Sequence, residues 1–130
     1  MKMRGEYFFL SNMYPCEITY LGHTYRSSEA AFQAQKDISR ASEFENLDGK
    51  EAKRLGRKVN MRPDWENVKV DIMEEILRAK FSDPDLKAQL LAVNEPIIEE
   101  NTWNDTFWGV CDGKGKNMLG RLLEKIKTEL

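Results

Sequence analysis

The chain has 130 residues, of which 41% are hydrophobic and 32% are charged, and its formal net charge is -2. This length predicts a single domain over residues 1–130 that buries a core without metals or disulfides. Domains that wrap nucleic acid through bulk positive charge are usually clearly basic, so the balance argues against that class. A small phosphate-bearing ligand needs only a few local basic side chains, so it is compatible with this net charge.

No window approaches the roughly 18 apolar residues of a membrane span, and "MKMRGEYFFLSNMYP" lacks a signal-peptide pattern. We therefore expect a cytoplasmic protein without membrane contact. Cys16 and Cys111 are too few for a disulfide framework and are expected to be reduced thiols. A catalytic pair of either cysteine with His23 is formally open, although buried cysteines more often act as small hydrophobes. Without HExxH or CxxC patterns, no metal and no cofactor are expected.

The N-terminal part predicts short strands. "FFLSN" is one candidate, and "ITYLGHTY" resembles a hairpin because β-branched and aromatic residues flank Leu21-Gly22. Asn12 stands inside an aromatic run, where it could hydrogen-bond a ligand or cap a turn. Ser27 or Ser28 can then cap a helix that begins at Glu29.

Helices dominate the rest of the chain. A short one is predicted over 49–56, and "DWENVKVDIMEEILRAKF" carries the clearest 3.6-residue apolar period. "SDPDLKAQLLAV" begins another, with Ser82 or Asp83 as the cap and Pro84 in its first turn. "EPIIEENT" is a strand candidate, 103–117 a loop, and "NMLGRLLEKIKTEL" a closing amphipathic helix. The predicted class is therefore α+β, a helix-rich domain with a small sheet.

Two segments carry side chains suited to chemistry. In "SSEAAFQAQK", Glu29, Gln33 and Lys36 share one helix face, which is either an ordinary solvated surface or a pocket wall. In "TWNDTFWGVCDGKGKN", tryptophans, an acid and glycines suit a loop that stacks a flat ring, although Trp108 could equally be core. The helix after these glycines could hold a phosphate at its N-terminus, helped by Lys114 or Lys116.

Five blocks together resemble one family. "FFLSNMYPC", "YRSSEAAFQAQK", "EAKRLGRKV", "RPDWENVKVDIMEEILRAKF" and "NDTFWGVCDGKGKNMLGRLLEKIK" occur in the order found in the NADAR, or YbiA-like, family, over roughly residues 5 to 127. The resemblance implies a YbiA-like fold and an N-glycosidase that splits phosphorylated ribosylaminopyrimidine intermediates of riboflavin synthesis. Other members remove ADP-ribose from modified guanine in DNA. A module that binds ADP-ribose or NAD without turnover is a further alternative.

The resemblance also implies roles for individual residues. The catalytic candidates are Glu29, Lys36 and Asp105, because cleaving an N-glycosidic bond needs a proton donor and a negative charge near the developing oxocarbenium ion. The substrate-binding candidates are Asn12, Gln33, Trp65, Lys80, Trp108, Gly109 and Asn117. Lys36 and Lys80 are also candidates for a Schiff base with an opened ribose. We expect these residues to line one cleft; the partner is a small phosphorylated ribosyl or ADP-ribosyl substrate, with ADP-ribosylated DNA as an option.

Overall fold

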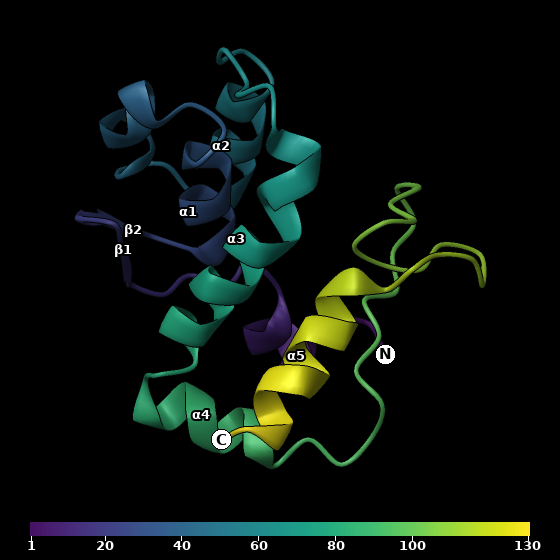
Figure 1. The fold of residues 1–130 in the computed structure, drawn as a ribbon. Coiled ribbons are helices and arrows are strands. Elements are labelled where there is room, and N and C mark those ends of the chain that lie inside the picture. Colours follow the sequence, from purple (N-terminus) through teal and green to yellow (C-terminus); the bar gives the residue numbers. More distant parts are fainter. The chain divides into compact units, whose positions relative to one another are not determined.

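The computed structural model describes residues 1–130 and separates into two compact units (Figure 1). The central unit is Asn12–Ser82; the terminal unit combines Met1–Ser11 with Asp83–Leu130. Five α-helices, two 3-10 helices and one two-stranded sheet make up the chain, which confirms the predicted helix-rich α+β class. None of these helices is long and apolar enough to cross a membrane.

The sheet of the central unit is the predicted hairpin. Strands β1 (Ile18–Tyr20) and β2 (His23–Tyr25) pair antiparallel. Leu21 and Gly22 connect them with φ values of 49° and 86°. Positive φ at both positions is the geometry of a two-residue turn that matches the twist of the strands, and glycine adopts it at no steric cost.

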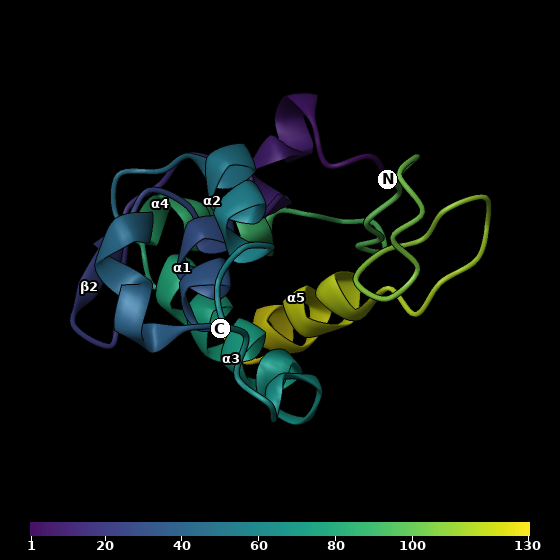
Figure 2. The same cartoon turned by 90° about the horizontal axis from the view of Figure 1, so that it is seen from above.

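Helix α1 (Ser28–Ala34) lies in the middle of the central unit, in contact with the hairpin and with the other helices of that unit (Figures 1 and 2). Its cap is Ser27, whose Oγ accepts a hydrogen bond from the Ala30 N–H at 3.1 Å. The surrounding helices are η2 (Ile38–Phe44), α2 (Gly49–Gly56) and α3 (Trp65–Lys80). Because neighbours pack on several sides of it, α1 is apolar and small on most of its surface.

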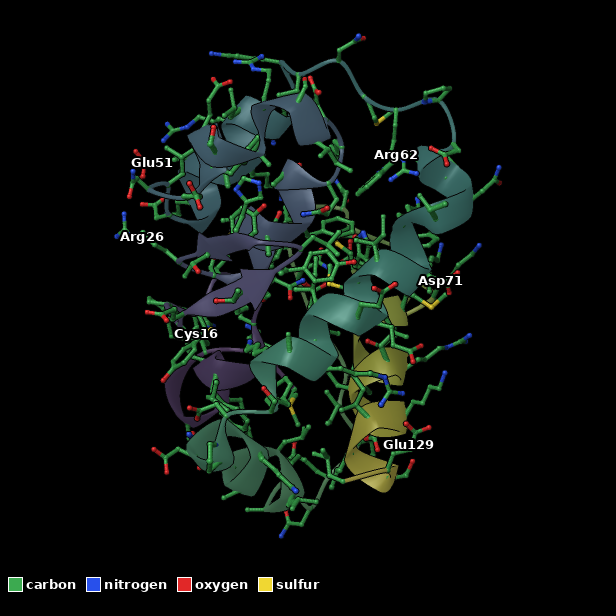
Figure 3. All side chains as sticks on the ribbon, turned by 60° about the vertical axis from the view of Figure 1, so that its left-hand side comes forward. Cys16, Arg26, Glu51, Arg62, Asp71 and Glu129 are labelled. Carbon is green, nitrogen blue, oxygen red and sulfur yellow. The ribbon has the colours of Figure 1, made fainter.

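Two local devices fix the ends of α2 and α3. Asp48 and Glu51 form a capping box, in which each side chain accepts from the other residue's backbone N–H. Arg62, labelled in Figure 3 just before α3, donates two hydrogen bonds to the Asp64 carboxylate at 2.6 and 2.9 Å. Along α3 the buried positions follow the predicted period: Trp65, Ile72, Met73, Ile76, Leu77 and Lys80.

The terminal unit contains η1 (Gly5–Leu10), α4 (Pro84–Leu91) and α5 (Met118–Thr128). Asp83 caps α4 by accepting from the Leu86 N–H at 3.0 Å, which settles the choice between the two predicted caps. Between α4 and α5 the chain runs without a long helix or strand, and Figure 1 shows this segment extending beside α5 before it loops. The Ile97 N–H donates to the Glu124 carboxylate of α5 at 2.9 Å.

Two predicted strands were wrong. "FFLSN" lies largely in the 3-10 helix η1, because a short run of adjacent apolar residues fits a buried helical turn as well as a strand. "EPIIEENT" contributes only an isolated bridge between Glu100 and Val110. Some of its other backbone groups bond to side chains instead of to a neighbouring strand: the Glu99 N–H donates to Asn117 Oδ1 at 2.9 Å. The helix η2 had not been predicted at all.

Candidate functional site

The polar face of α1 is buried rather than solvated. Glu29 and Gln33 are only 8% and 5% exposed. The Gln33 amide donates from Nε2 to Glu29 Oε1 at 3.0 Å. Burying a carboxylate is costly unless hydrogen bonds compensate. A solvated helix face is therefore the wrong interpretation, and the carboxylate and the amide form a connected pair inside the central unit.

Two glycines allow α2 to lie close against this pair. A Cβ atom on Gly56 would stand 2.0 Å from Gln33 Oε1, and one on Gly49 would stand 2.3 Å from Met13 Sδ and 3.5 Å from Glu29 Cβ. Any larger residue would push the helices apart or rotate the Gln33 amide. Gln33 Oε1 accepts no hydrogen bond within the chain, although it is fully buried. Close helix packing is thus achieved at the expense of one unsatisfied acceptor.

Lys36 follows the end of α1, and its ammonium lies over an aromatic ring. Its Nζ is 5.8 Å from the centre of the Trp65 ring, which also contacts Phe32 at 4.9 Å between centroids. Burial lowers the pKa of Lys36 below its usual value; Glu29 acts in the opposite direction, while nearby cations lower the pKa further. Trp65 is only 5% exposed, so its ring here supports Lys36 and the core. Its predicted role in stacking a base stays a prediction.

Asn12 joins the start of α1 through two contacts. Its carbonyl accepts from the Glu29 N–H at 2.9 Å, and its Oδ1 accepts from Ser28 Oγ at 2.8 Å. These bonds fix Asn12 in a turn, as one of the two alternatives predicted. Its Nδ2 donates to no group of the chain, so the other alternative, a hydrogen bond to a ligand, is compatible with the same geometry. This amide N–H₂ belongs to a residue bonded to the first turn of α1 and can donate to a ligand.

Lys80 ends α3 as a fully buried side chain, 1% exposed. Its Nζ lies 5.7 Å from the Tyr14 ring centre and 5.2 Å from that of Phe81. Burial lowers the pKa of Lys80 to about 8, a shift that the nearby Cys16 partly opposes. An amine with a pKa near neutrality is partly unprotonated and can act as a nucleophile or a base.

In the terminal unit, Asp105 organises its own loop. Its Oδ1 accepts from the backbone N–H groups of Phe107 and Trp108 at 3.1 and 2.9 Å. Asn101 completes the turn by accepting from the Asp105 N–H at 3.1 Å and donating to its carbonyl at 2.8 Å. The carboxylate therefore has a structural use in the loop, and its catalytic role stays a prediction.

Trp108 and Gly109 lie in the same loop. The half-buried Trp108 ring packs edge-on against Phe107, at 4.9 Å between centroids and an angle of 79°. A Cβ on Gly109 would stand 2.1 Å from Glu99 Oε2 and 2.6 Å from Asn101 Nδ2. Close packing of the loop therefore requires glycine at position 109. Trp103, in the same loop, is 60% exposed.

The expected phosphate site at the N-terminus of α5 is not supported. The N–H groups of Met118 and Leu119 donate to the carbonyls of Phe107 and Trp108 at 3.1 and 3.0 Å, so they are already engaged. The Asn117 amide donates to the Ile97 carbonyl at 3.0 Å and accepts from the Glu99 N–H. Asn117, at φ 52°, therefore ties the extended segment to the helix.

A hollow of about 580 Å³ opens beside the hairpin of the central unit, and none of the predicted catalytic or substrate-binding residues is among those that line it. Its lining is Cys16, Glu17, Thr24, Tyr25, Arg26, Glu45 and Asn46. Arg26, labelled in Figure 3, donates to the Asn46 carbonyl at 2.9 Å. His23 lies 3.4 Å from Glu45, which gives it an acidic partner, and neither cysteine forms a disulfide. No group of three or more His, Cys, Asp or Glu side chains could hold a metal ion.

Comparison with known proteins identifies the family of this chain. The NADAR domain matches residues 1–130. The chain belongs to the NADAR family. N-glycosidase YbiA of Escherichia coli (strain K12) is 39% identical over 132 residues, covering 96% of this chain and 82% of that protein. The NMR structure of E. coli YbiA is similar with a TM-score of 0.85 at 36% identity, covering 99% of this chain and 81% of that one.

A second group of relatives is longer than this NADAR chain. A riboflavin biosynthesis protein of Vibrio vulnificus (strain YJ016) is 41% identical over 129 residues. That match covers 94% of this chain but only 35% of the Vibrio protein, so the chain spans about a third of its length. The shared part is therefore the NADAR domain.

The site residues divide between the two units. In the central unit α1 brings Glu29, Gln33 and Lys36 together, with Asn12 at one end and Trp65 at the other. Lys80 belongs to the same unit, whereas Asp105, Trp108, Gly109 and Asn117 belong to the terminal unit. One cleft shared by both sets stays a prediction.

Sequence reasoning missed the partners of this NADAR site. Gly49 and Gly56 stand seven residues apart on α2, a spacing that repeats on one helix face and could have indicated close helix packing. Asn101, which supports the Asp105 turn, left no comparable signal in the sequence.

Proposed function

We propose that this NADAR chain is an N-glycosidase that hydrolyses the N-glycosidic bond of a phosphorylated ribosyl substrate, such as a ribosylaminopyrimidine phosphate. The observation that carries the proposal is the buried Glu29 carboxylate held by the Gln33 amide, with Lys36 close enough to interact with its charge and Asn12 bonded to the same helix turn. The names of the YbiA and riboflavin biosynthesis relatives support the same reaction class.

The chemistry assigned to Glu29 follows from the bond that breaks. When the C1′–N bond cleaves, the nitrogen leaves with the bonding electrons and takes up a proton, while C1′ becomes cationic. A carboxylate near C1′ stabilises that cation and can accept a proton from the attacking water. The Gln33 amide fixes the carboxylate in one orientation, and the Asn12 N–H₂ can bind a ribose hydroxyl.

The two lysines offer a covalent alternative. A neutral lysine can displace the base from the ring-opened ribose to form an imine at C1′, and water then hydrolyses the imine to the aldehyde and regenerates the amine. The lowered pKa favours Lys80, whereas the half-buried Lys36 is more accessible. Direct hydrolysis by water needs neither lysine as a nucleophile.

The test is to incubate the protein with a ribosylaminopyrimidine phosphate, with NAD and with ADP-ribosylated guanine DNA, and to measure the released base. We expect release from the first substrate. Release from the DNA alone would move the function to ADP-ribosyl removal, and binding without release would indicate a non-catalytic module.

Adding borohydride during turnover separates the two mechanisms. A trapped adduct, located on Lys36 or Lys80 by peptide mass spectrometry, identifies the covalent route and its nucleophile. Turnover without any adduct supports direct hydrolysis.

A further inference from the structure

Basic side chains from α2 converge on the end of α1. Gly56 contacts Gln33 so closely that the two helices meet at this point. Lys53 stands three residues before Gly56, so it lies on the same face of α2, and Arg57 follows directly at the end of that helix. Lys36 stands three residues after Gln33 on the α1 side. Lys53 and Arg57 are both close enough to act on the charge of Lys36.

A further cation comes from α3. The Trp65 ring lies under the Lys36 ammonium, and Lys69 stands four residues after Trp65, one turn along the same face. Lys69 is only 14% exposed and is 2.6 Å from Glu66 Oε2. Lys53, Arg57 and Lys69 all act on the Lys36 charge, and each lowers its pKa.

Charge is poorly balanced in this cluster. Of these cations, Lys36 is acted on by the Glu29 carboxylate and Lys69 pairs with Glu66. Neither Lys53 nor Arg57 forms an ion pair or a side-chain hydrogen bond within the chain, although the protein as a whole has a net charge of -2. An uncompensated cationic cluster at the edge of a buried polar pair is the kind of site that binds an anion.

We propose that Lys53 and Arg57, together with Lys36, form the subsite for the phosphate of the ribosyl substrate. This inference rests on the function proposed above. Glu29 stands in the first turn of α1 and Lys36 just beyond its end, close enough for Glu29 to act on the Lys36 charge, so C1′ can approach the carboxylate while the phosphate at the other end of the ribose meets the cations. Arg57 supplies a planar fork suited to two phosphate oxygens, and the lysines supply point charges. Lys69, held by Glu66, adds to the field.

The test compares a phosphorylated glycoside with its dephosphorylated form on the double variant Lys53→Gln/Arg57→Gln. Charge-assisted hydrogen bonds to a phosphate typically change affinity by about 10- to 100-fold each. We expect kcat/KM for the phosphorylated substrate to fall at least 10-fold while kcat/KM for the dephosphorylated substrate hardly changes. The matched control is Lys50→Gln/Arg54→Gln, which removes two cations from the exposed side of the same helix.

A binding measurement keeps this inference separate from the proposed reaction. Ribose 5-phosphate and ribose are titrated calorimetrically into the wild type, the double variant and the control. Loss of ribose 5-phosphate binding in the double variant alone supports the subsite, even if no glycoside is hydrolysed. Equal binding by all three proteins, or equal losses for both glycosides, would overturn it while leaving an observed hydrolysis intact.

Discussion

The two polar regions of the molecule use their carboxylates differently. In the central unit, the Glu29 side chain is buried and is held by another side chain, Gln33. In the terminal unit, the part-exposed Asp105 side chain binds the backbone of its own loop at two N–H groups. The Asp105 carboxylate accepts from two backbone N–H groups and so shapes its loop, whereas the printed partner of the Glu29 carboxylate is the amide of another predicted site residue, Gln33. The contrast leads to a two-part prediction: Glu29 takes part in the reaction, and Asp105 mainly holds the shape of its loop.

The largest expected effect tests the first half of this contrast. Glu29→Gln keeps the shape and an acceptor oxygen for Gln33 but removes the charge. General acid–base roles are typically worth about 10²–10⁴-fold in rate, so kcat should fall by that factor while substrate affinity and melting temperature stay close to those of the wild type.

The control is Asp85→Asn, which removes an exposed first-turn acid from α4. If Glu29 only favoured its helix dipole, both substitutions would cost a few tenths to about 1 kcal/mol of stability and leave kcat unchanged. Unchanged turnover in Glu29→Gln would remove it from the reaction.

The next largest effect concerns the buried Lys80 side chain and is measured as a change in the free energy of unfolding. Burial lowers the pKa of Lys80 from 10.5 to about 8, so between those values the unfolded chain binds more protons than the folded one. The stability contribution therefore rises as the pH increases from 8 to 10.5, and the cost of burying the charge is fully present below pH 8. Lys80→Met should raise the free energy of unfolding at pH 7 by up to roughly 3 kcal/mol.

The same variant should lose the pH-dependent gain in stability that the wild type shows between pH 8 and 10. Above pH 10 the raised pKa of Tyr20, about 12, acts in the opposite direction, so the comparison stops there. Urea unfolding at each pH measures the difference, with the exposed Lys87→Met as the control. A Lys80→Met protein that is less stable than the wild type at pH 7 would contradict the argument. Stability gained together with activity lost would show that Lys80 is kept for function.

The next prediction tests whether Trp108, in the terminal unit, binds the substrate or only packs within its loop. Removing a stacking platform costs on the order of 1–3 kcal/mol per base, so Trp108→Ala should weaken substrate binding by that amount. Trp103→Ala is the matched control, because this ring is 60% exposed in the same loop. Calorimetric titration of both variants decides the point. If Trp108→Ala lowers only the melting temperature and leaves Kd unchanged, Trp108 is a core residue of the loop.

The sequence predicted some parts of the molecule better than others, for physical reasons. The hairpin, α3 and α4 were predicted because their signals are local: a turn dipeptide, an apolar period and a proline in the first turn. The bounds predicted for α2 were also correct, and the structure adds the capping box at its start. The segment 95–102 was misassigned because its extended backbone bonds to side chains of Glu124 and Asn117, which are distant in sequence. Hydrogen bonds to such distant side chains produce no periodic pattern in the sequence from which the structure could be predicted.

The candidate site shows the same limit. Spacing alone placed Glu29 and Gln33 on one face, and their hydrogen bond confirms it. Spacing could not decide whether that face was buried, because burial depends on Gly49 and Gly56 of another helix. For Asn117, the helix-start pattern indicated a free anion site, but the preceding loop fills it with its own carbonyls.

The smallest expected effect tests the second half of the contrast, through two substitutions at one position. Asp105→Asn keeps an oxygen that can accept from the N–H groups of Phe107 and Trp108, whereas Asp105→Ala leaves both donors without that partner. Losing such an acceptor costs about 1 kcal/mol, so the alanine variant should unfold at lower urea concentration and the asparagine variant should match the wild type. Because the loop use needs the oxygen and not the charge, Asp105→Asn should also keep its turnover to within a few-fold. A loss of about 10²-fold or more in kcat for Asp105→Asn, at unchanged stability, would show that the charge itself takes part in the reaction and would place Asp105 beside Glu29 as a second catalytic carboxylate.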